Sequence, residues 1–203
     1  MSVTIVGPRD RRKTLPGEQL VNTTSHAADD WQRGLSPFAL GPCQLYDGMV
    51  GALVENCWQF AKLYPEHADG TGQPTEAYWA WAKRGWQSPQ PVRYPMGKGR
   101  KPVCLLWDGD RFGYVQGRLK VYWSLYRDAV KKTGAFARLQ ELHRSGVGVV
   151  LFDFDGYDHD SASTSLAQVL QDDSRPMGHA FVLKSMLLFG PDVKPEEVIA
   201  SGY

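Results

Sequence analysis

The stretch VGVVLFDF, residues 147–154, decides how the fold is read, because it is the clearest strand in the sequence. Its β-branched and apolar residues favour a buried strand. Helical periodicity or helix boundary signals mark most of the chain around it. We predict helices near 48–64, 75–84, 114–132, 135–144, 165–171, 179–189 and 195–200, and short strands at Val3–Val6 and 103–107. Because helix outweighs strand and the strands are unevenly spaced, we expect an α+β fold: a compact, mainly helical single domain with a small central sheet.

Length and composition are those of an ordinary soluble globular protein. The chain has 203 residues, of which 42% are hydrophobic and 22% charged. The net charge of +1 gives no overall field that favours nucleic acid or an anionic membrane. No apolar run reaches the roughly 18 residues of a membrane span. We therefore expect a cytoplasmic protein with no membrane partner and three reduced cysteines. Residues 1–34 are expected to form an N-terminal extension that packs on a catalytic domain, 35–203.

The acidic residues after the strand resemble the opening signature of the haloacid dehalogenase superfamily. There a strand delivers an aspartyl nucleophile, here Asp153, and a second acid follows two residues later, here Asp155. That family needs further strands, a lysine and another acidic pair downstream. Only residues 161–203 follow Asp160, which is too short for those elements, and Tyr157 departs from the motif. We therefore do not expect a phosphatase.

The acidic cluster keeps a physical meaning without that family. Ligand sites often lie at the carboxyl ends of strands, so Asp155 and Asp158 are candidate catalytic carboxylates. The alternative is that these acids cap the next helix or face solvent. Oxygen ligands for a divalent ion are a weaker hypothesis, because the calcium-loop pattern is absent. No Cys or His pair has ligand spacing, so we expect no metal.

The segment 48–64 carries more information. If Asp47 caps a helix that runs from Gly48 to Tyr64, then Glu55, Gln59 and Lys62 share one face. Trp58 lies beside that face. This stripe is either a pocket wall or an exposed charge pair worth a few tenths of a kcal/mol.

The order LSPF, then YDG, then ENCWQFAK over residues 35–62 resembles the opening of the NADAR family. That family has a Leu-Ser-Asn-Phe loop followed by a helix with Glu-His-x-x-Gln-x-x-Lys. Glu55, Gln59 and Lys62 match in spacing, whereas Asn56 replaces the His and Pro37 replaces the loop Asn. The late Trp-Gly and Gly-x-Asn-x-Leu-Gly segments of the family are not clearly present. The chain therefore resembles a divergent member.

The resemblance implies a small α+β N-glycosidase of phage or bacterial type that uses no cofactor. Its substrate would be a small nucleotide or an ADP-ribosylated base, cleaved at the C–N bond between the base and ribose phosphate. One alternative is a transferase that modifies a nucleobase or DNA, with nucleic acid as the acceptor. Another is a non-catalytic nucleotide-binding protein.

Such a reaction passes through an oxocarbenium-like state. A carboxylate near the anomeric carbon either stabilises that cation or activates the attacking water. Glu55 is the first candidate for this role, with Asp155 and Asp158 in reserve. Phosphate needs cations, and a base needs a flat partner; glycines in the loop 93–102 would let it approach a phosphate. Each of these features also has a purely structural explanation. The loop 93–102 could be a mobile surface loop, and the stripe Tyr114–Tyr122 could be the boundary of an amphipathic helix. His179 could cap the helix that it begins. The candidate substrate-binding residues are Tyr46, Trp58, Gln59, Lys62, Arg93, Trp107, Asp108, Tyr114, Arg118, Tyr122 and His179.

Overall fold

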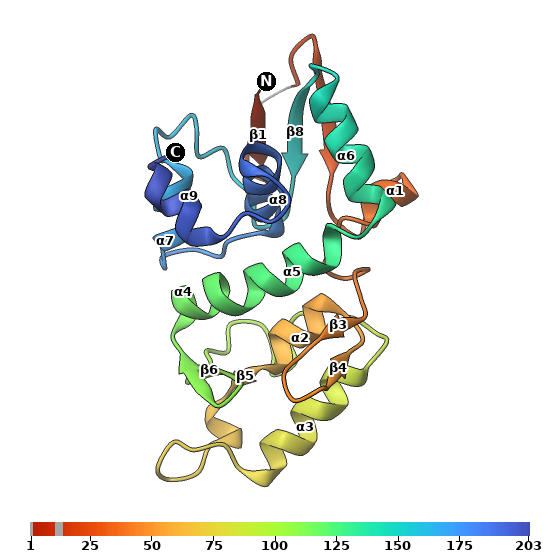
Figure 1. Ribbon diagram of the computed structural model, residues 1–203. Coiled ribbons are helices and arrows are strands. Elements are labelled where there is room, and N and C mark those ends of the chain that lie inside the picture. Colours follow the sequence, from red (N-terminus) through yellow and green to blue (C-terminus); the bar gives the residue numbers. More distant parts are fainter. Residues whose placement is uncertain (1, 11–13) are drawn as a thin grey trace. The chain divides into compact units, whose positions relative to one another are not determined.

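The α+β class is confirmed by a computed structural model of the chain, which describes residues 2–10 and 14–203. Helices predominate and the sheets are small (Figure 1). The chain forms two compact units, described separately below. Unit 1 consists of Met1–Ser36 and Tyr126–Tyr203, and unit 2 of Pro37–Leu125. One boundary between them falls inside helix α5 (Trp123–Val130).

Unit 1 is built on a three-stranded parallel sheet with the order β1-β8-β2. The central strand β8 (Gly148–Phe152) is the expected one, and β1 (Val3–Val6) has the predicted bounds. The second edge strand, β2 (Glu18–Asn22), was not predicted, because only one of its residues is fully buried and its pattern is weak. All three strands run in one direction, so their carboxyl ends meet at one edge of the sheet.

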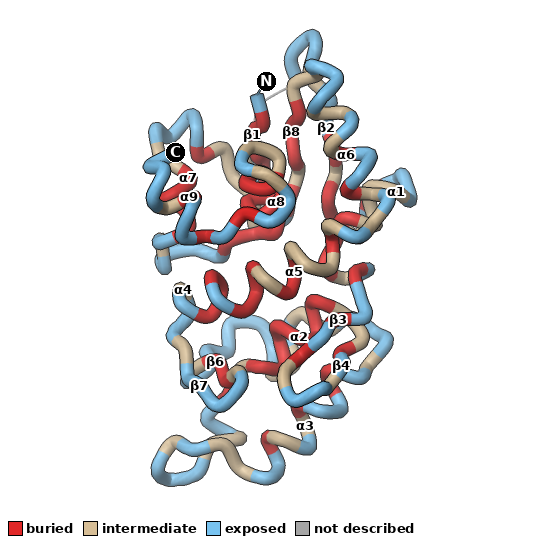
Figure 2. Tube along the Cα trace, viewed as in Figure 1, coloured by how far each residue is buried: buried red, intermediate tan, exposed pale blue. Residues whose placement is uncertain are grey.

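The core of unit 1 lies between the sheet and helix α8 (His179–Phe189), which packs on β1 and β8. The first eight residues of α8 are buried, as Figure 2 shows in red. Its bounds match the prediction, because an apolar run lies between Gly178 and Gly190. The remaining helices of this unit are α1 (Asp30–Arg33), α6 (Gly134–Arg144), α7 (Leu166–Gln171) and α9 (Pro195–Ser201).

Unit 2 is organised around a short buried helix, α2 (Val54–Phe60). All seven residues of α2 are buried, and the helix packs against α3 (Glu76–Gln87) and the π-helical segment η2 (Arg118–Tyr122). Two antiparallel sheets complete the unit. The other elements are β3 (Cys43–Gln44), β4 (Val50–Gly51), β5 (Lys62–Leu63), the 3₁₀ helix η1 (Pro65–His67), β6 (Cys104–Trp107), β7 (Asp110–Phe112) and α4 (Tyr114–Gly117).

The expected helix over 48–64 is wrong at its start. Residues 43–51 form a hairpin in which Asp47 (φ 51°) and Gly48 (φ 71°) make the turn. Asp-Gly is a preferred pair for such turns, because both positions need positive φ. The N-cap of α2 is Leu53 and not Asp47, and Lys62 lies beyond the helix on β5.

The expected long helix over 114–132 is present as consecutive pieces: α4, then η2, then α5. Helical periodicity predicts a uniform α-helix here and gives no sign of the π-turn. A π-turn widens the helix locally and often marks a functional position. The Tyr114, Arg118, Tyr122 stripe therefore passes through irregular helix.

The expected division of the chain at residue 34 differs from the observed one. Residues 1–34 supply two of the three strands of the unit 1 sheet, so the described part of this segment is an integral part of unit 1 and no extension. Residues 1 and 11–13 lie outside the described residues. In the part of the chain that is described, no helix has both the length and the apolar character needed to cross a bilayer.

Candidate functional site

Glu55, Gln59 and Lys62 are joined by a continuous hydrogen-bonded chain in unit 2. Gln59 Nε2 donates to Glu55 Oε1 at 2.9 Å, and Lys62 Nζ donates to Gln59 Oε1 at 2.7 Å. The Glu55–Gln59 contact follows from i, i+4 spacing on α2. Lys62 reaches Gln59 from β5 because its side chain is long. The amide of Gln59 thus links the carboxylate to the ammonium.

The surroundings of this chain are aromatic and cationic. Lys62 Nζ lies 4.7 Å from the centroid of the Trp58 ring, and the Trp58 and Tyr122 rings lie 5.3 Å apart. Arg118 is buried on η2, with its guanidinium carbon 5.2 Å from the centroid of the half-exposed Tyr114 ring. Glu55 itself is only 5% exposed. The predicted residues of α2, β5 and η2 therefore gather in one region of unit 2.

Asn56, which stands where the NADAR helix has His, is fully buried and ties a loop to α2. Its amide nitrogen donates to the carbonyls of Ser88 and Gln90 at 2.9 and 2.8 Å, and its oxygen accepts from the amide of Val92 at 2.8 Å. An imidazole has two nitrogens and cannot make these three contacts at once. Asn56 thus anchors the beginning of the segment that leads into the predicted basic loop.

Tyr46, Trp107 and Asp108 form a second group in unit 2. The Tyr46 and Trp107 rings lie 5.2 Å apart, edge to face. Burial, with the carboxylates of Asp47 and Asp108, raises the pKa of Tyr46 to about 12. The phenol therefore stays protonated at neutral pH and is available as a hydrogen-bond donor.

Arg93 lies on the loop after α3, where its guanidinium carbon is 5.4 Å from the centroid of the Tyr94 ring. Gly97 and Gly99 both have positive φ, at 97° and 84°, which favours glycine at these two positions of the loop. An ion pair between Arg100 and Glu66 holds this loop to η1. The loop is thus fixed at two places, by Asn56 and by Glu66.

His179 belongs to unit 1, where both of its ring nitrogens are engaged. Nδ1 lies 3.1 Å from Asp153 Oδ2, and Nε2 lies 2.8 Å from the carbonyl oxygen of Thr23. The ring is thus held between a carboxylate and a backbone carbonyl. Asp153 Oδ2 also accepts from the amide of Ala180 at 3.0 Å, which caps α8 in place of a side chain at Gly178. The amino end of α8 is thus occupied by Asp153.

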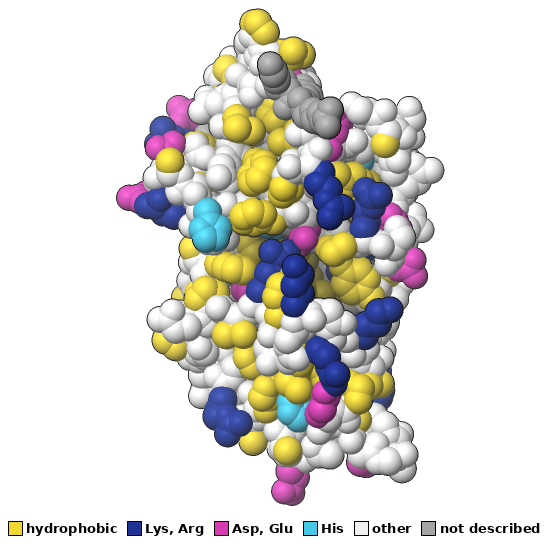
Figure 3. All heavy atoms as spheres, turned by 180° about the vertical axis from the view of Figure 1, so that it is seen from behind, with side chains coloured by type: hydrophobic (Ala, Val, Ile, Leu, Met, Phe, Trp, Pro, Cys, Tyr) yellow, Lys and Arg dark blue, Asp and Glu magenta, His cyan; other side chains and the backbone are white. Residues whose placement is uncertain are grey.

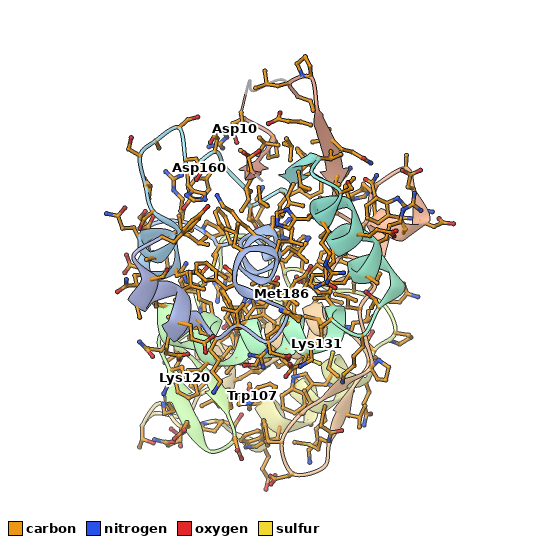
Figure 4. All side chains as sticks on the ribbon, turned by 45° about the horizontal axis from the view of Figure 1, so that its top comes forward. Asp10, Trp107, Lys120, Lys131, Asp160 and Met186 are labelled. Atoms are coloured by element: carbon orange, nitrogen blue, oxygen red, sulfur yellow. The ribbon has the colours of Figure 1, made fainter. Side chains whose placement is uncertain are left out.

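Asp155 and Asp158 also belong to unit 1, on the loop between β8 and α7. The amide of Asp155 donates to Asp153 Oδ1 at 3.1 Å. Asp158 accepts from the amide and the hydroxyl of Ser161 at 3.1 and 2.6 Å, which stabilises a local turn. Its amide donates to Asp10, and Figure 4 shows Asp10 and Asp160 on the loops that follow β1 and β8. These contacts fix the loops at the carboxyl edge of the sheet.

A second buried cluster of unit 1 was not predicted. Lys184 is 1% exposed, and its Nζ donates to Asp160 Oδ2 at 2.8 Å and to His159 Nε2 at 2.9 Å. His159 Nδ1 lies 2.7 Å from the carbonyl of Thr164, so it carries the ring hydrogen of a neutral imidazole. Burial lowers the pKa of His159, and the ammonium of Lys184 adds to this effect. Burial also lowers the pKa of Lys184, against the opposing effect of Asp160.

One sequence signal could have indicated this cluster: Lys184 is the single charge in the otherwise apolar run AFVLKSMLLF. A cation on a buried helix requires a partner. The capping role of Asp153 has no comparable local signal, because its partner helix begins 26 residues later. Among the described residues, no group of three or more His, Cys, Asp or Glu side chains is arranged to hold a metal ion.

The geometry thus places eleven of the predicted residues in unit 2: Glu55, Tyr46, Trp58, Gln59, Lys62, Arg93, Trp107, Asp108, Tyr114, Arg118 and Tyr122. The other three, Asp155, Asp158 and His179, belong to unit 1. Comparison with models of protein families and with curated protein sequences finds no match to this chain.

Proposed function

We propose that unit 2 carries an N-glycosidase site that cleaves the C–N bond between a nucleobase-type group and ribose phosphate or ADP-ribose. The observation that supports this most is the chain Lys62–Gln59–Glu55. The three residues whose spacing matches the NADAR helix are also joined by hydrogen bonds. The Glu55–Gln59 contact follows from helical spacing, but the chain also connects a buried carboxylate to a half-buried ammonium, and the proposed reaction needs both groups.

In this mechanism Glu55 stabilises the oxocarbenium-like state or activates the attacking water. Gln59 holds one oxygen of the carboxylate, which fixes the orientation of the other. Lys62, which is half-buried, is the cation for a substrate phosphate. Trp58 offers an aromatic surface beside that ammonium, on which a base can stack. Every step of this mechanism uses residues of unit 2 alone.

A thermal-shift screen with ADP-ribose, NAD, ribose 5-phosphate and common nucleotides tests the proposal, with mass spectrometry of each mixture. We expect stabilisation by a ribose phosphate and release of a free base. A product attached to an acceptor would instead indicate a transferase, and a ligand recovered intact would indicate a binding protein. No shift with any ribose phosphate would contradict all three functions.

Glu55→Gln is the decisive variant, because it keeps the shape of the side chain and removes its charge. We expect turnover to fall by a factor of roughly 10² to 10⁴, the usual contribution of an acid–base group, while the ligand-induced shift persists. Glu76→Gln is the matched control, since Glu76 is exposed in the first turn of α3. If Glu55→Gln cleaves as fast as the wild type, the assigned role is wrong.

A further inference from the structure

A long segment of unit 2 is free of acidic residues. Residues 77–107 contain six lysines and arginines but no Asp or Glu. The six are Lys83, Arg84, Arg93, Lys98, Arg100 and Lys101. The rest of the chain has 17 lysines and arginines against 22 acids. The segment is therefore strongly positive, although the net charge of the whole chain is only +1.

Most of these cations are exposed and lack a counter-charge. Among the residues that the structure describes, Lys83, Arg84, Lys98 and Lys101 form no ion pair, and all four are exposed. Arg100 does pair with Glu66. On the face of the molecule in Figure 3, lysine and arginine side chains lie mostly among uncharged ones, with acidic side chains beside some of them.

Two contacts connect the two ends of the segment. Arg100 is held to Glu66, and the neighbouring His67 ring lies 4.6 Å from the ring of Trp81 on α3. Arg84 follows Trp81 by one helical turn on the same face. These contacts link the basic loop to the face of α3 that carries Arg84. We call Arg84, Lys98, Lys101 and Tyr94 the basic surface.

Two features fix this surface and add an aromatic side chain. Asn56 of α2 bonds Ser88, Gln90 and Val92, so the segment that precedes the basic loop is held to α2. Tyr94 is 47% exposed, with the Arg93 guanidinium beside its ring. An exposed ring among cations is the combination that binds single-stranded nucleic acid, because bases stack on the ring while phosphates contact the cations.

A simpler explanation accounts for part of the charge. Lys83 and Arg84 lie in the last turns of α3, where cations compensate the helix dipole. That explanation does not extend to Lys98 and Lys101, which lie in a loop, nor to the half-exposed Tyr94. Nor does it explain why no acid occurs over the whole segment.

We propose that the basic surface of unit 2, formed by Arg84, Lys98, Lys101 and Tyr94, binds a single strand of nucleic acid through its phosphates and one stacked base. This proposal is independent of the glycosidase proposal, because unmodified DNA carries no ADP-ribose. The two can therefore fail separately.

The test is fluorescence anisotropy with the whole chain and a fluorescein-labelled oligo-dT of about 20 nucleotides, over a range of salt concentrations. Each phosphate contact on a single strand contributes about −0.7 to the slope of log K against log salt. The double variant Lys98→Gln/Lys101→Gln should make this slope shallower by about 1.4 and weaken binding roughly tenfold or more near 0.1 M salt. Tyr94→Ala should weaken binding roughly tenfold and leave the slope unchanged.

The matched control is Lys132→Gln/Arg144→Gln, which removes two exposed cations from unit 1 and should leave the slope unchanged. Thermal melting of each variant verifies that it is folded. The proposal is overturned if the wild type does not bind at about 50 mM salt, or if Lys98→Gln/Lys101→Gln retains the wild-type slope. Tighter binding of a duplex than of the single strand would also overturn it.

Discussion

Unit 1 contains ion pairs in which at least one partner is buried, whereas the acid-free segment of unit 2 presents exposed cations that form no ion pair among the described residues. In unit 1, Asp153 and His179 contact each other and are both buried, and the buried Lys184 pairs with the half-exposed Asp160. Lys131 pairs with Asp128 and Asp192 at the surface. Among the described residues of unit 2, the three exposed cations of the basic surface form no ion pair. Exposed cations such as Lys132 and Arg144 of unit 1 also form none in the described part of the chain, but each of these lies within four residues of an Asp or Glu in the sequence. The basic surface differs in that its segment contains no acid at all.

The same contrast applies to the buried polar groups. Asp153 and His179 of unit 1 are enclosed by acceptors and donors of their own unit, and they hold the amino end of α8. The chain Lys62–Gln59–Glu55 of unit 2 begins at a half-buried ammonium and ends at a carboxylate. The Asp153–His179 contact stabilises the fold of unit 1, whereas the Lys62–Gln59–Glu55 chain of unit 2 has the residue types that the proposed reaction needs. The predictions below test this difference, from the largest effect to the smallest.

The largest effect is expected for Asp153→Ala. The substitution leaves the buried ring of His179 without its carboxylate and the amide of Ala180 without its acceptor. Each buried polar group left without its partner costs about 1–3 kcal/mol, so we expect the loss of both contacts to cost about 3–5 kcal/mol of unfolding free energy. Urea denaturation measures the loss.

Two further variants sharpen that measurement. Asp153→Asn keeps an acceptor for Ala180 and removes the charge, so its loss should be smaller than that of Asp153→Ala. Asp173→Ala changes an exposed aspartate of the same unit and should be nearly neutral. If Asp153→Ala is as stable as Asp173→Ala, the pair does not hold unit 1 together and the comparison between the units fails.

Asn56→Ala tests the anchor of unit 2. It leaves the carbonyls of Ser88 and Gln90 and the amide of Val92 without their side-chain partner. Each unsatisfied buried group costs about 1–3 kcal/mol, and partial access to water reduces the sum, so we expect a loss of roughly 2–3 kcal/mol. Hydrogen exchange should also become faster at the Val92 amide. Gln87→Ala, at an exposed site on α3, is the control, and equal exchange in both variants would contradict the anchoring role.

The two units also differ in how much of them could be predicted from the sequence. The strand β1 and the helix α8 were predicted at their observed bounds, because each is an apolar run with clear flanking residues. The contact of Glu55 with Gln59 follows from helical spacing alone. The hairpin before α2 was missed, although Asp47-Gly48 is a hairpin signal, since Asp47 also suits a helix N-cap.

The remaining features depend on contacts between distant segments. Nothing near Asp153 in the sequence indicates that it caps α8, and nothing near Asn56 indicates that it holds residues 88–92. The segments of unit 1 come from both ends of the chain, so periodicity could not reveal that residues 1–34 complete its sheet. Local pattern predicts elements, whereas the polar anchors become visible only when the elements are packed.

His159→Gln tests the buried cluster through its pH dependence. Burial and Lys184 lower the pKa of His159 in the folded chain, so below about pH 6.5 the unfolded chain binds the proton first. Stability therefore falls as the pH drops below that value, by at most about 1.4 kcal/mol per pH unit for one proton. Asp160 and Asp158 also face this cluster and act in the opposite direction.

The glutamine variant has no proton to bind, so its stability should depend less on pH between about 6.5 and 5. His67 and His143, whose pKa values burial also lowers, keep part of the dependence in both proteins. His26→Gln is the control, because His26 does not belong to the cluster. Urea denaturation at several pH values measures the slope, and an equal slope for His159→Gln and wild type would disprove a neutral buried His159.

The smallest effect is expected for Lys131→Gln, which removes an ion pair at the surface of unit 1. Lys131 Nζ lies 2.8 Å from Asp192 and 3.0 Å from Asp128, and these hydrogen bonds raise the pKa of the lysine. Because water screens such pairs, the loss should be about 0.2–1 kcal/mol and should shrink at high salt. Urea denaturation at low and high salt measures it, with Lys132→Gln as the control. A loss as large as that of Asp153→Ala would mean that pairing at the surface, and not the buried Asp153–His179 contact, is what distinguishes unit 1 from unit 2.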